Sequence, residues 1–473
     1  MENSQKGKVY FLMKKNYYIP DWLAFRTYFF GTDKSRTVIS NEYKHEYVLL
    51  EALSSDFWFV LVNSKTFDEI NDWAIEHKID NQVEAFIDVL QKQGLLLSDA
   101  ESRDFIHDEQ NKQDNDETAT IQFETDLKKW CFDNGLLFSL FIELTYSCNL
   151  DCVHCFNPKN NNHQIGFNEV KKIIDDAYEI GCFRLTLSGG EATLHKDFIN
   201  IVRYARNKRM SVEFFSNGQL LYDNPYLLDE IKKLYPYRIG LSIYSMDSQE
   251  HDNVTNVKGS WNKVVSIAKR LRENNINVQI KNFLLALNYR SCISVKEFAK
   301  AIKANYVADL SLIPTIEGDK KTLNFEVGEE GLFNLYSNPE SPLFVKDIKL
   351  KDFSKLLNTS LCYGGFSSLS ISPVLDVFPC CSMPYKIANL REKSLIEIWN
   401  NSLKAKKDSK LYQLQNTKGK DLKECYKEDY CKFCNYCPGM GMLENGFLRK
   451  SDVLCRQAKV KMKAYKKIIS STK

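Results

Sequence analysis

The sequence contains no long hydrophobic run and carries almost no excess of charge. In its 473 residues no apolar segment approaches the roughly 18 residues that a membrane-spanning helix needs. Residues 1–8 are polar, so they lack the hydrophobic segment of a secretory signal. Lys and Arg number 64 against 61 Asp and Glu, and the formal net charge of +3 gives no reason to expect nucleic-acid binding. We therefore expect a cytoplasmic protein that binds neither membranes nor nucleic acids.

The chain is rich in cysteine, with 14 residues. A secreted disulfide scaffold would be short and would carry a signal segment, and this chain shows neither feature. Eleven of the fourteen cysteines lie in two groups, at residues 148–155 and 362–455. In a reducing compartment such grouped thiolates indicate a metal site, and iron–sulfur and zinc are the two alternatives. The isolated Cys131, Cys182 and Cys292 are expected to be small buried hydrophobes.

Residues 1–97 have the pattern of a small α/β unit. An aromatic-rich segment at residues 17–30 is followed by three short helical patterns, and the last of them ends at Gly94. This order suggests a winged helix, a fold that often binds DNA. Its helices, however, carry acidic residues such as Asp68 and Glu84 and few Lys or Arg, so a phosphate backbone would be repelled. Peptide or protein binding is favoured over DNA binding, and a purely structural cap is a further alternative.

The rest of the chain divides by pattern into four regions. Residues 98–120 are polar, acidic and poor in apolar residues, which is typical of a solvated linker. Hydrophobic residues make up 44% of the chain, and its length suits about three domains with their own cores. The four regions are an acidic linker and lead-in at 98–136, a βα-repeat domain at 137–320, a bridging region at 321–360, and a cysteine-rich domain with a basic tail at 361–473.

Six strand-like runs alternate with helix-like runs in the βα-repeat domain. The strands are predicted at residues 138–144, 183–188, 211–216, 238–243, 277–283 and 309–313. One apolar helical face, which includes Val170 and Ile174, ends at Gly181, and a second includes Val264 and Leu271. The spacing suits parallel strands joined by right-handed crossovers. The predicted fold class is therefore α/β, with a six-stranded parallel sheet that is open or curled into a partial (β/α)6 barrel. We expect function at the carboxyl ends of its strands.

Directly after the first predicted strand stands the run Cys148-Asn-Leu-Asp-Cys152-Val-His-Cys155. Three thiolates on one loop can hold three irons of a [4Fe–4S] cube and leave the fourth iron open to a small molecule. The alternative is a zinc loop, in which His154 would have to be the fourth ligand although it stands between two cysteines. The motif, its position after the first strand and the βα repeat that follows resemble the radical S-adenosylmethionine (SAM) superfamily.

The resemblance implies that the amino and carboxylate groups of SAM chelate the open iron. It also implies SAM contacts at the ends of the next three strands. The corresponding residues here are Gly189, Gly190 and Glu191 in a GGE loop, then Ser216 and Asn217, then Ser242. Ordinary turn chemistry is the alternative for the last two strand ends. The family often has an arginine after the fourth strand, but residues 251–259 contain none, and Lys258 is the candidate that remains for the SAM carboxylate.

The second cysteine group resembles the SPASM extension of radical SAM maturases, which carries two auxiliary [4Fe–4S] clusters. A zinc ribbon would use four cysteines in two pairs, whereas eight stand between residues 362 and 455. Two features depart from the family pattern, because Leu375 replaces a usual glycine and the internal spacing of residues 425–437 differs. Order along the chain assigns an inner cluster to Cys362, Cys380 and Cys437, with Cys381 or an open site in fourth place, and an outer cluster to Cys425, Cys431, Cys434 and Cys455.

A winged helix fused ahead of a radical SAM–SPASM enzyme resembles a recognition element of ribosomally made, post-translationally modified peptides (RiPPs). Such an element binds the leader of a precursor peptide, usually as an added strand at a sheet edge. The resemblance implies three [4Fe–4S] clusters, SAM and an external flavodoxin- or ferredoxin-like electron donor. It also implies a 5′-deoxyadenosyl radical that abstracts hydrogen from the core peptide.

We expect the product to be an intrapeptide cross-link through a thioether or a carbon–carbon bond. Hydrogen abstraction by a radical needs no general base, so the sequence predicts no catalytic side chain. One alternative is a maturase that oxidises a Ser or Cys side chain of a protein, as sulfatase-maturing relatives do. The other is a non-enzymatic iron–sulfur protein that transfers electrons.

Overall fold

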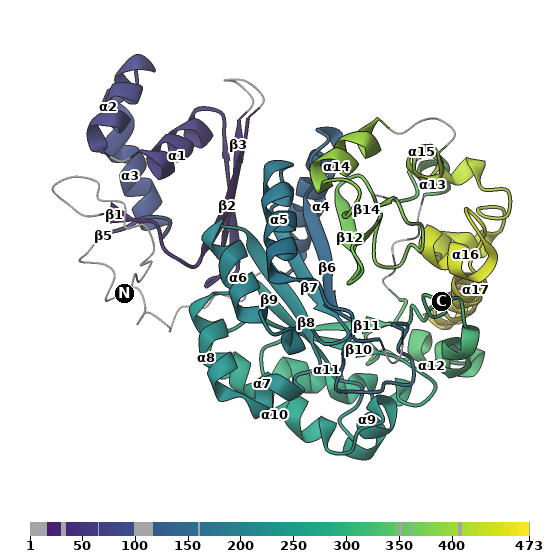
Figure 1. The fold of residues 1–473 in the computed structure, drawn as a ribbon. Coiled ribbons are helices and arrows are strands. Elements are labelled where there is room, and N and C mark those ends of the chain that lie inside the picture. The colour runs from purple at the N-terminus through teal and green to yellow at the C-terminus, as the bar shows by residue number, and fades with distance from the viewer. Residues whose placement is uncertain are drawn as a thin grey trace. The chain divides into compact units, whose positions relative to one another are not determined.

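Figure 1 shows the fold of the chain in a computed structural model. The model divides into two compact units, the first of which comprises residues 1–127, 202–211 and 231–237. Most of the predicted acidic linker, residues 99–116, lies outside the described residues, as do residues 1–16. The structure describes residues 17–29, 35–64, 66–98, 117–158, 161–346, 348, 350, 352–358, 360–362, 364–404 and 409–472.

The described residues between 17 and 98 of the first unit contain a three-stranded antiparallel sheet, a pair of short strands and three α-helices. Its strands are β2 (Leu23–Tyr28), β3 (Arg36–Asn41) and β4 (Glu46–Glu51) in sheet order, β1 (Tyr17–Tyr18) pairs with β5 (Leu97–Ser98), and the helices are α1 (Leu53–Asn63), α2 (Phe67–Glu76) and α3 (Val83–Lys92). These are the three helices that the sequence predicts, and Gly94 takes a left-handed φ of 68° just after α3. Trp58, Leu61 and Ile70 lie in the buried core that the sheet and helices share.

A buried arginine stabilises the first unit. Arg206 is 6% exposed, and burial lowers its pKa to about 10. Its guanidinium donates hydrogen bonds to the carbonyls of Asp21 and Met210, each at 2.8 Å, and of Leu234 at 3.0 Å. One of its nitrogens lies 3.9 Å from the Glu42 carboxylate. A single side chain therefore satisfies polar groups from several separate segments, which would otherwise be buried without partners.

Replacing Arg206 with methionine should destabilise the chain by about 3–5 kcal/mol, because the buried Glu42 carboxylate would lose its cation. Urea denaturation followed by tryptophan fluorescence measures this loss. The control Lys232→Met removes an exposed cation from the same unit and should change stability by less than about 0.5 kcal/mol. Equal unfolding midpoints for the two variants would show that Arg206 has no such role.

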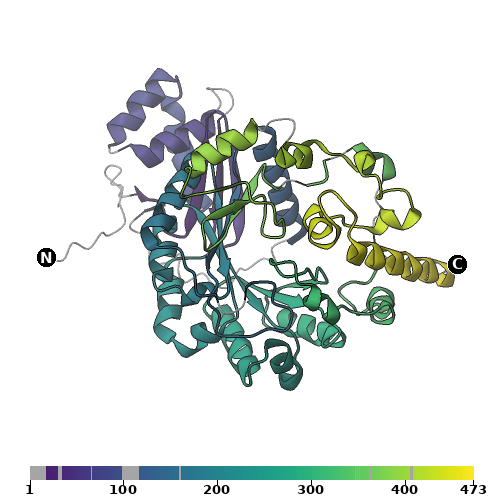
Figure 2. The ribbon, with the colours of Figure 1, turned by 45° about the vertical axis from the view of Figure 1, so that its right-hand side comes forward.

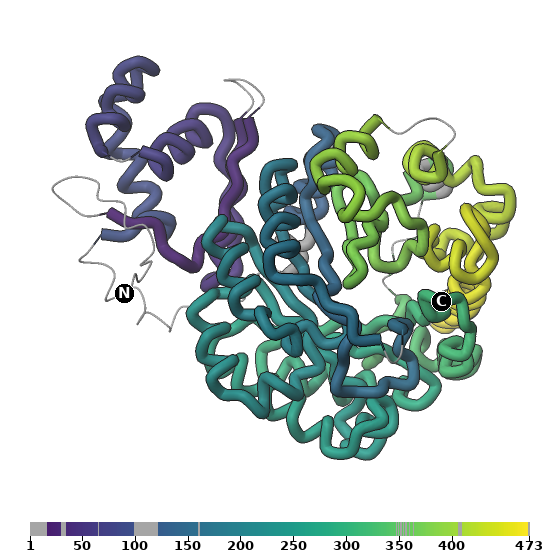
Figure 3. The backbone as a smooth tube through the Cα atoms, in the orientation of Figure 1, coloured from purple at the N-terminus to yellow at the C-terminus, as the bar shows by residue number. Residues whose placement is uncertain are grey.

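The second unit is built on six parallel strands in sequential order, which can be followed along the tube in Figure 3. They are β6 (Ser139–Thr145), β7 (Arg184–Gly189), β8 (Ser211–Ser216), β9 (Arg238–Ser242), β10 (Val278–Phe283) and β11 (Asn305–Asp309). The first five confirm the predicted strands to within one residue at each end. The sixth was predicted wrongly at 309–313. Because β11 is the last strand of the sheet, its side chains are partly exposed and mixed in polarity. The apolar Leu310, Leu312 and Ile313, which led to the prediction, follow it as coil.

The predicted helical faces are present as well. α5 buries Val170, Ile173 and Ile174, and α10 buries Val264 and Leu271. The end of the predicted solvated linker is already helical, because α4 begins at Glu117, and further along this helix Leu127 is buried. The helices of the region are α4 (Glu117–Asp133), α5 (Phe167–Glu179), α6 (Phe198–Asn207), α7 (Gln219–Asp223), α8 (Pro225–Lys233), α9 (Ser248–Thr255), α10 (Ser260–Glu273) and α11 (Cys292–Ala301).

Three strands of the cysteine-rich region extend the barrel sheet beyond β6, which the sequence did not predict. They are β12 (Ser368–Ile371), β13 (Asp376–Phe378) and β14 (Ala388–Asn389). β12 pairs parallel with β6 and so covers an edge of backbone groups that would otherwise be open. Leu375 in the β12–β13 turn has a φ of 68° and is 3% exposed. This is a backbone conformation that suits glycine, and burial of the leucine offsets the strain.

The bridging region and the tail are mainly helical. α17 packs against α12 through a cluster that includes Tyr336, Val460 and Ala464, and Figure 2 shows the two helices side by side. The predicted basic tail is therefore part of a long helix with one buried face. In the described part of the chain no helix is long and apolar enough to cross a membrane. The helices are α12 (Glu329–Ser337), α13 (Phe353–Asn358), α14 (Leu395–Leu403), α15 (Lys410–Asn416), α16 (Pro438–Asn445) and α17 (Asp452–Thr472).

Candidate functional site

The loop with Cys148, Cys152 and Cys155 leaves the carboxyl end of β6, where the sequence predicts function. Its backbone is anchored to the end of α9, because the Val153 amide donates to the Val254 carbonyl at 3.0 Å. Burial, together with the charges of the neighbouring thiols, raises the pKa of Cys148 to about 11 and that of Cys152 to about 12. The three thiols therefore converge on one place, and the cost of their ionisation would be recovered by binding a cationic cluster.

The ring of His154, which a zinc loop would need as its fourth ligand, packs against two aromatic side chains. Its ring stacks on Phe283, with centroids 5.1 Å apart and an interplanar angle of 11°, and meets Tyr244 edge-on. Burial lowers the pKa of His154 to about 4, so the ring is neutral at physiological pH. The side chain packs as an aromatic wall beside the cysteines.

The two glycines of the GGE loop are required by close packing. A Cβ on Gly189 would lie 2.2 Å from the Thr145 carbonyl oxygen, and one on Gly190 would lie 2.4 Å from the Ser147 carbonyl oxygen. Gly189 also has a φ of 135°. The end of β7 therefore presses directly on the backbone that enters the cysteine loop. The sequence-based reading gave these glycines a contact with the methionine part of SAM, and it did not foresee this second reason for them.

Glu191 connects the end of β7 to the end of β8. Its carboxylate is 1% exposed and accepts hydrogen bonds from the Thr193 hydroxyl at 2.5 Å and the Asn217 amide nitrogen at 2.6 Å. Burial raises the pKa of Glu191. The side-chain amide of Asn217 in turn donates to Asn149 at 2.7 Å and lies 3.7 Å from the sulfur of Cys148. These contacts place both predicted SAM residues against the cysteine loop.

The remaining predicted SAM contacts lie at the neighbouring strand ends. The Ser216 hydroxyl accepts a hydrogen bond from the Gly218 amide at 2.9 Å, which is the turn chemistry considered as its alternative. Ser242 hydrogen-bonds the Tyr244 hydroxyl, and this hydroxyl also hydrogen-bonds the thiol of Cys152. Tyr244 therefore joins β9 to the cysteine loop, a role that its sequence position did not reveal. Lys258 is exposed.

The cysteines of the second group meet at two places. Burial raises the pKa of Cys380, and the charges of Cys381, Cys362 and Cys437 raise it further, so these four thiols lie near one another. The assigned outer-cluster cysteines line one pocket together. None of the fourteen cysteines forms a disulfide. The members of this outer set are Cys425, Cys431, Cys434 and Cys455.

Cys381 faces a different way from Cys380. Burial of its thiol raises the pKa of Cys381, the nearby carboxylate of Glu143 on β6 raises this pKa further, and Lys281 on β10 lowers it. Both are residues of the barrel strands, so Cys381 faces the barrel interior. Its charge also raises the pKa of Cys380, so Cys381 lies between the inner cysteines and Glu143, and its place as the fourth inner ligand stays a prediction. The isolated Cys131, Cys182 and Cys292 are buried, as expected for structural cysteines.

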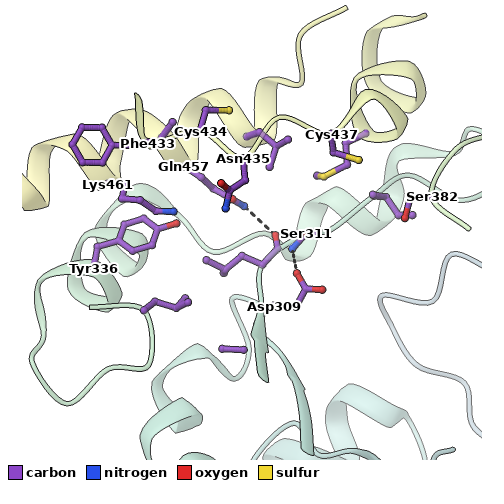
Figure 4. A pocket seen from close by; sticks show the side chains of 17 residues that line it. Asp309, Ser311, Tyr336, Ser382, Phe433, Cys434, Asn435, Cys437, Gln457 and Lys461 are labelled. Atoms are coloured by element: carbon purple, nitrogen blue, oxygen red, sulfur yellow. Dashed lines mark hydrogen bonds between the residues drawn. The ribbon is translucent and has the colours of Figure 1, made fainter. Parts of the chain in front are cut away.

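A cavity of about 400 Å³ opens between the end of β11, α12, α17 and the Cys434–Cys437 loop (Figure 4). Its lining includes Cys437, which is assigned to the inner auxiliary cluster, and Cys434, which is assigned to the outer one. Gln457 of α17 donates a hydrogen bond to the Leu310 carbonyl at 3.0 Å and so joins two of its walls. The cavity was not predictable from local pattern, because its walls come from segments more than 100 residues apart.

Comparison with known proteins identifies the family. Residues 142–302 match the radical SAM superfamily, and residues 362–438 match the SPASM iron–sulfur cluster-binding domain. This chain is a radical SAM enzyme with a SPASM domain. A radical SAM enzyme of this kind uses a [4Fe–4S] cluster, SAM and auxiliary iron–sulfur clusters, and the converging thiols described above fit such groups chemically.

Several radical SAM relatives are similar over most of their length. The enzyme is 27% identical over 338 residues to the AdoMet-dependent heme synthase of Methanosarcina barkeri, which covers 66% of this chain and 94% of the relative. It is 27% identical over 331 residues to the antilisterial bacteriocin subtilosin biosynthesis protein AlbA of Bacillus subtilis, and this match covers 67% of this chain and 70% of the relative. The crystal structure of Streptococcus suis SuiB bound to precursor peptide SuiA matches with a TM-score of 0.53 at 16% identity, over 92% of this chain and 99% of that one. At this identity the structural likeness shows the fold alone.

Replacing Cys148, Cys152 and Cys155 together with alanine should lower the iron content of the anaerobically reconstituted enzyme from about twelve to about eight atoms per chain. The measurement is iron and sulfide analysis beside electron paramagnetic resonance. Cys182→Ala serves as the matched control and should retain about twelve irons, since Cys182 is buried beside the Phe138 and Arg184 carbonyls and belongs to neither cysteine group. About four irons and bound zinc in the parent would contradict the two auxiliary clusters.

Proposed function

We propose that this enzyme modifies a ribosomally made precursor peptide by radical hydrogen abstraction and joins two of its residues in an intrapeptide cross-link. The observation that carries the proposal is the convergence of two further cysteine sets beside a radical SAM barrel. An oxidative cross-link needs a place for the electron that the substrate loses, and auxiliary clusters supply one. The bond is a thioether or a carbon–carbon bond. A relative named for bacteriocin biosynthesis and a structural neighbour bound to a precursor peptide support a peptide substrate.

The first unit is proposed to bind the leader of the precursor as a recognition element. β4 is the end strand of its sheet, and in the described residues no strand pairs with its outer edge. The opposite edge is engaged, because the Phe25 amide of β2 donates to the Arg209 carbonyl at 2.9 Å. Leu49 on β4 is 36% exposed and Leu53 just after it is 40% exposed. An extended peptide could add to this edge by main-chain hydrogen bonds and cover these side chains.

When bound, a [4Fe–4S] cluster with SAM supplies one-electron cleavage of SAM and abstraction of a substrate hydrogen atom, and auxiliary clusters supply electron transfer. We assign the first cluster to Cys148, Cys152 and Cys155. Tyr244 and His154 form its apolar wall and exclude water. The inner and outer auxiliary clusters are assigned as in the sequence, to Cys362, Cys380 and Cys437 and to Cys425, Cys431, Cys434 and Cys455.

The proposed SAM contacts are supported by their positions around the cysteine loop. Glu191 and Asn217 are positioning residues for this loop as well, because their hydrogen bonds reach Asn149 and approach the sulfur of Cys148. The residues proposed to contact SAM are Gly189, Gly190, Glu191, Ser216, Asn217 and Ser242.

A tetrapyrrole substrate is the second candidate, because one relative is named a heme synthase. That relative matches only 66% of this chain, so a third of the chain has no counterpart in the match. Oxidation of a Ser or Cys side chain in a protein is a further alternative, and activity without residues 1–97 would favour it. Membership of the radical SAM superfamily argues against the non-enzymatic alternative. Fourteen free cysteines support a reducing, cytoplasmic location with a flavodoxin- or ferredoxin-like electron donor.

The enzyme, co-expressed with short peptides encoded beside its own gene, should convert one of them to a product about 2 Da lighter per cross-link. Each closed bond removes two hydrogens from the peptide. Tandem mass spectrometry checks the mass and shows whether the cross-linked residues fail to fragment apart. The triple cysteine variant is the matched control and should leave the peptide unchanged. Conversion of a porphyrin by the enzyme, with no change in any peptide, would contradict the proposal.

Leu49→Asp should weaken binding of the peptide found in that experiment at least tenfold, because a carboxylate at the β4 edge cannot be buried by an added strand. Fluorescence anisotropy of the labelled peptide with the full-length enzyme measures the affinity. Ile75→Asp, which alters a 60% exposed side chain of α2, is the matched control and should bind like the parent. Unchanged affinity in the Leu49 variant would exclude the β4 edge as the leader site.

A further inference from the structure

The interior of the barrel holds charged side chains that the cysteine loop does not use. Along β6 the side chains alternate, and Leu140, Ile142 and Leu144 are fully buried on one face. Glu143 and Phe141 point the opposite way, toward the interior. There the rings of Phe141 and Phe215 pack with centroids 6.1 Å apart, and the Lys281 ammonium lies 3.4 Å from the Phe215 centroid.

Glu143 is an acid of this interior whose carboxyl has no hydrogen-bond or ion-pair partner among the described residues. It is 7% exposed. The titratable groups near it are the Tyr146 phenol on its own strand end and the Cys381 thiol, on which Lys281 also acts. Burial raises the pKa of Glu143 to about 7. A carboxyl with this pKa can take up and release a proton near neutral pH.

Three other acids of the barrel interior and strand ends, Glu213, Glu191 and Asp309, each have an ion-pair or hydrogen-bond partner. Glu213 pairs with Arg238 at 2.6 Å, and although burial opposes its ionisation, the guanidinium holds the pKa of Glu213 below its usual range. Both carboxylate oxygens of Glu191 accept hydrogen bonds, one from the Thr193 hydroxyl and one from the Asn217 backbone amide. Asp309 accepts from the Ser311 amide at 2.7 Å. Glu143 alone among these four has no partner in the described structure, and a buried carboxyl without a partner is costly to keep unless it has a use.

We propose that Glu143 is a catalytic residue that accepts the proton lost by the second reacting group of the substrate as the cross-link closes. This inference rests on the proposed function. A substrate C–H bond breaks and its hydrogen atom goes to the 5′-deoxyadenosyl radical. An S–H or C–H bond of the second residue then breaks, its proton goes to the Glu143 carboxylate, and a new bond joins the two residues. The one remaining electron passes to an iron–sulfur cluster as acceptor.

The test measures 5′-deoxyadenosine and cross-linked peptide together, in the full-length reconstituted enzyme with its peptide. In Glu143→Gln the ratio of 5′-deoxyadenosine to cross-linked peptide should rise about 100-fold over the parent, because hydrogen abstraction continues while bond closure lacks its base. Glu143→Asp keeps a carboxylate and should show an intermediate ratio. Glu179→Gln, at the exposed end of α5, is the matched control and should keep the parental ratio.

The pH profile gives a second readout. Glu143 must be ionised to act as a base, so the parent rate of cross-linking should rise with pH through about 7 and this rise should be absent in Glu143→Gln. Two results for Glu143→Gln would overturn the proposal. In the first, 5′-deoxyadenosine and cross-linked peptide form in the parental ratio, and in the second, neither product forms. The second case would assign Glu143 to SAM binding or folding instead.

A third readout needs no substrate and so separates this inference from the proposed function. Difference infrared spectroscopy of the substrate-free protein should show a carboxyl that titrates near pH 7 and is missing in Glu143→Gln. Failure to find a peptide substrate, with this titration present, would count against the cross-linking function alone. Titration of Glu143 near the ordinary value of 4.5 would overturn the assignment of the base itself.

Discussion

The site depends on the close packing of two backbone segments, the end of β7 and the residues that lead from β6 into the cysteine loop. No side chain fits between Gly189 and the Thr145 carbonyl, nor between Gly190 and the Ser147 carbonyl. Main-chain hydrogen bonds hold the two segments together, and in one of them the Gly190 amide donates to the Thr145 carbonyl at 2.7 Å. Since the next residue of the loop is Cys148, an atom added at either glycine would displace the first thiol. The position of the cluster is thus set by sterics before any iron is bound.

A second constraint joins the two cysteine groups. β12 pairs with β6 in parallel, so the chain that follows β12 is carried to the same strand from which the first cysteine loop departs. The turn at Leu375 and the short strand β13 then place Cys380 toward Cys362 and Cys437, and Cys381 toward Glu143. The pairing that covers the edge of β6 therefore also brings Cys380 and Cys381 close to Glu143 of that strand.

The features predicted correctly are those that depend on residues close to one another in the sequence. The parallel strands β6 to β10, the amphipathic faces of α5 and α10 and the CxxxCxxC loop follow from periodicity and spacing along the chain. The position of β11 was wrong because an edge strand loses the apolar signal that marks buried strands. β12 and the role of Arg206 were missed because pairing with β6 and capture of carbonyls from remote segments leave no periodic trace. Glu143 was missed for a related reason, since the sequence does not show that a single acid in an apolar strand is buried without a partner.

Burial explains why the barrel interior can combine radical and acid–base chemistry. Excluding water protects a reactive carbon radical from side reactions, and the aromatic rings of Phe141, Phe215 and Phe283 provide such surroundings. The same exclusion disfavours a charged carboxylate and raises the pKa of Glu143 to about 7. A carboxyl at the surface would be too weak a base to hold a proton at neutral pH. In the proposed mechanism, the exclusion of water that protects the radical therefore also gives Glu143 a pKa suited to accepting the proton released when the cross-link closes.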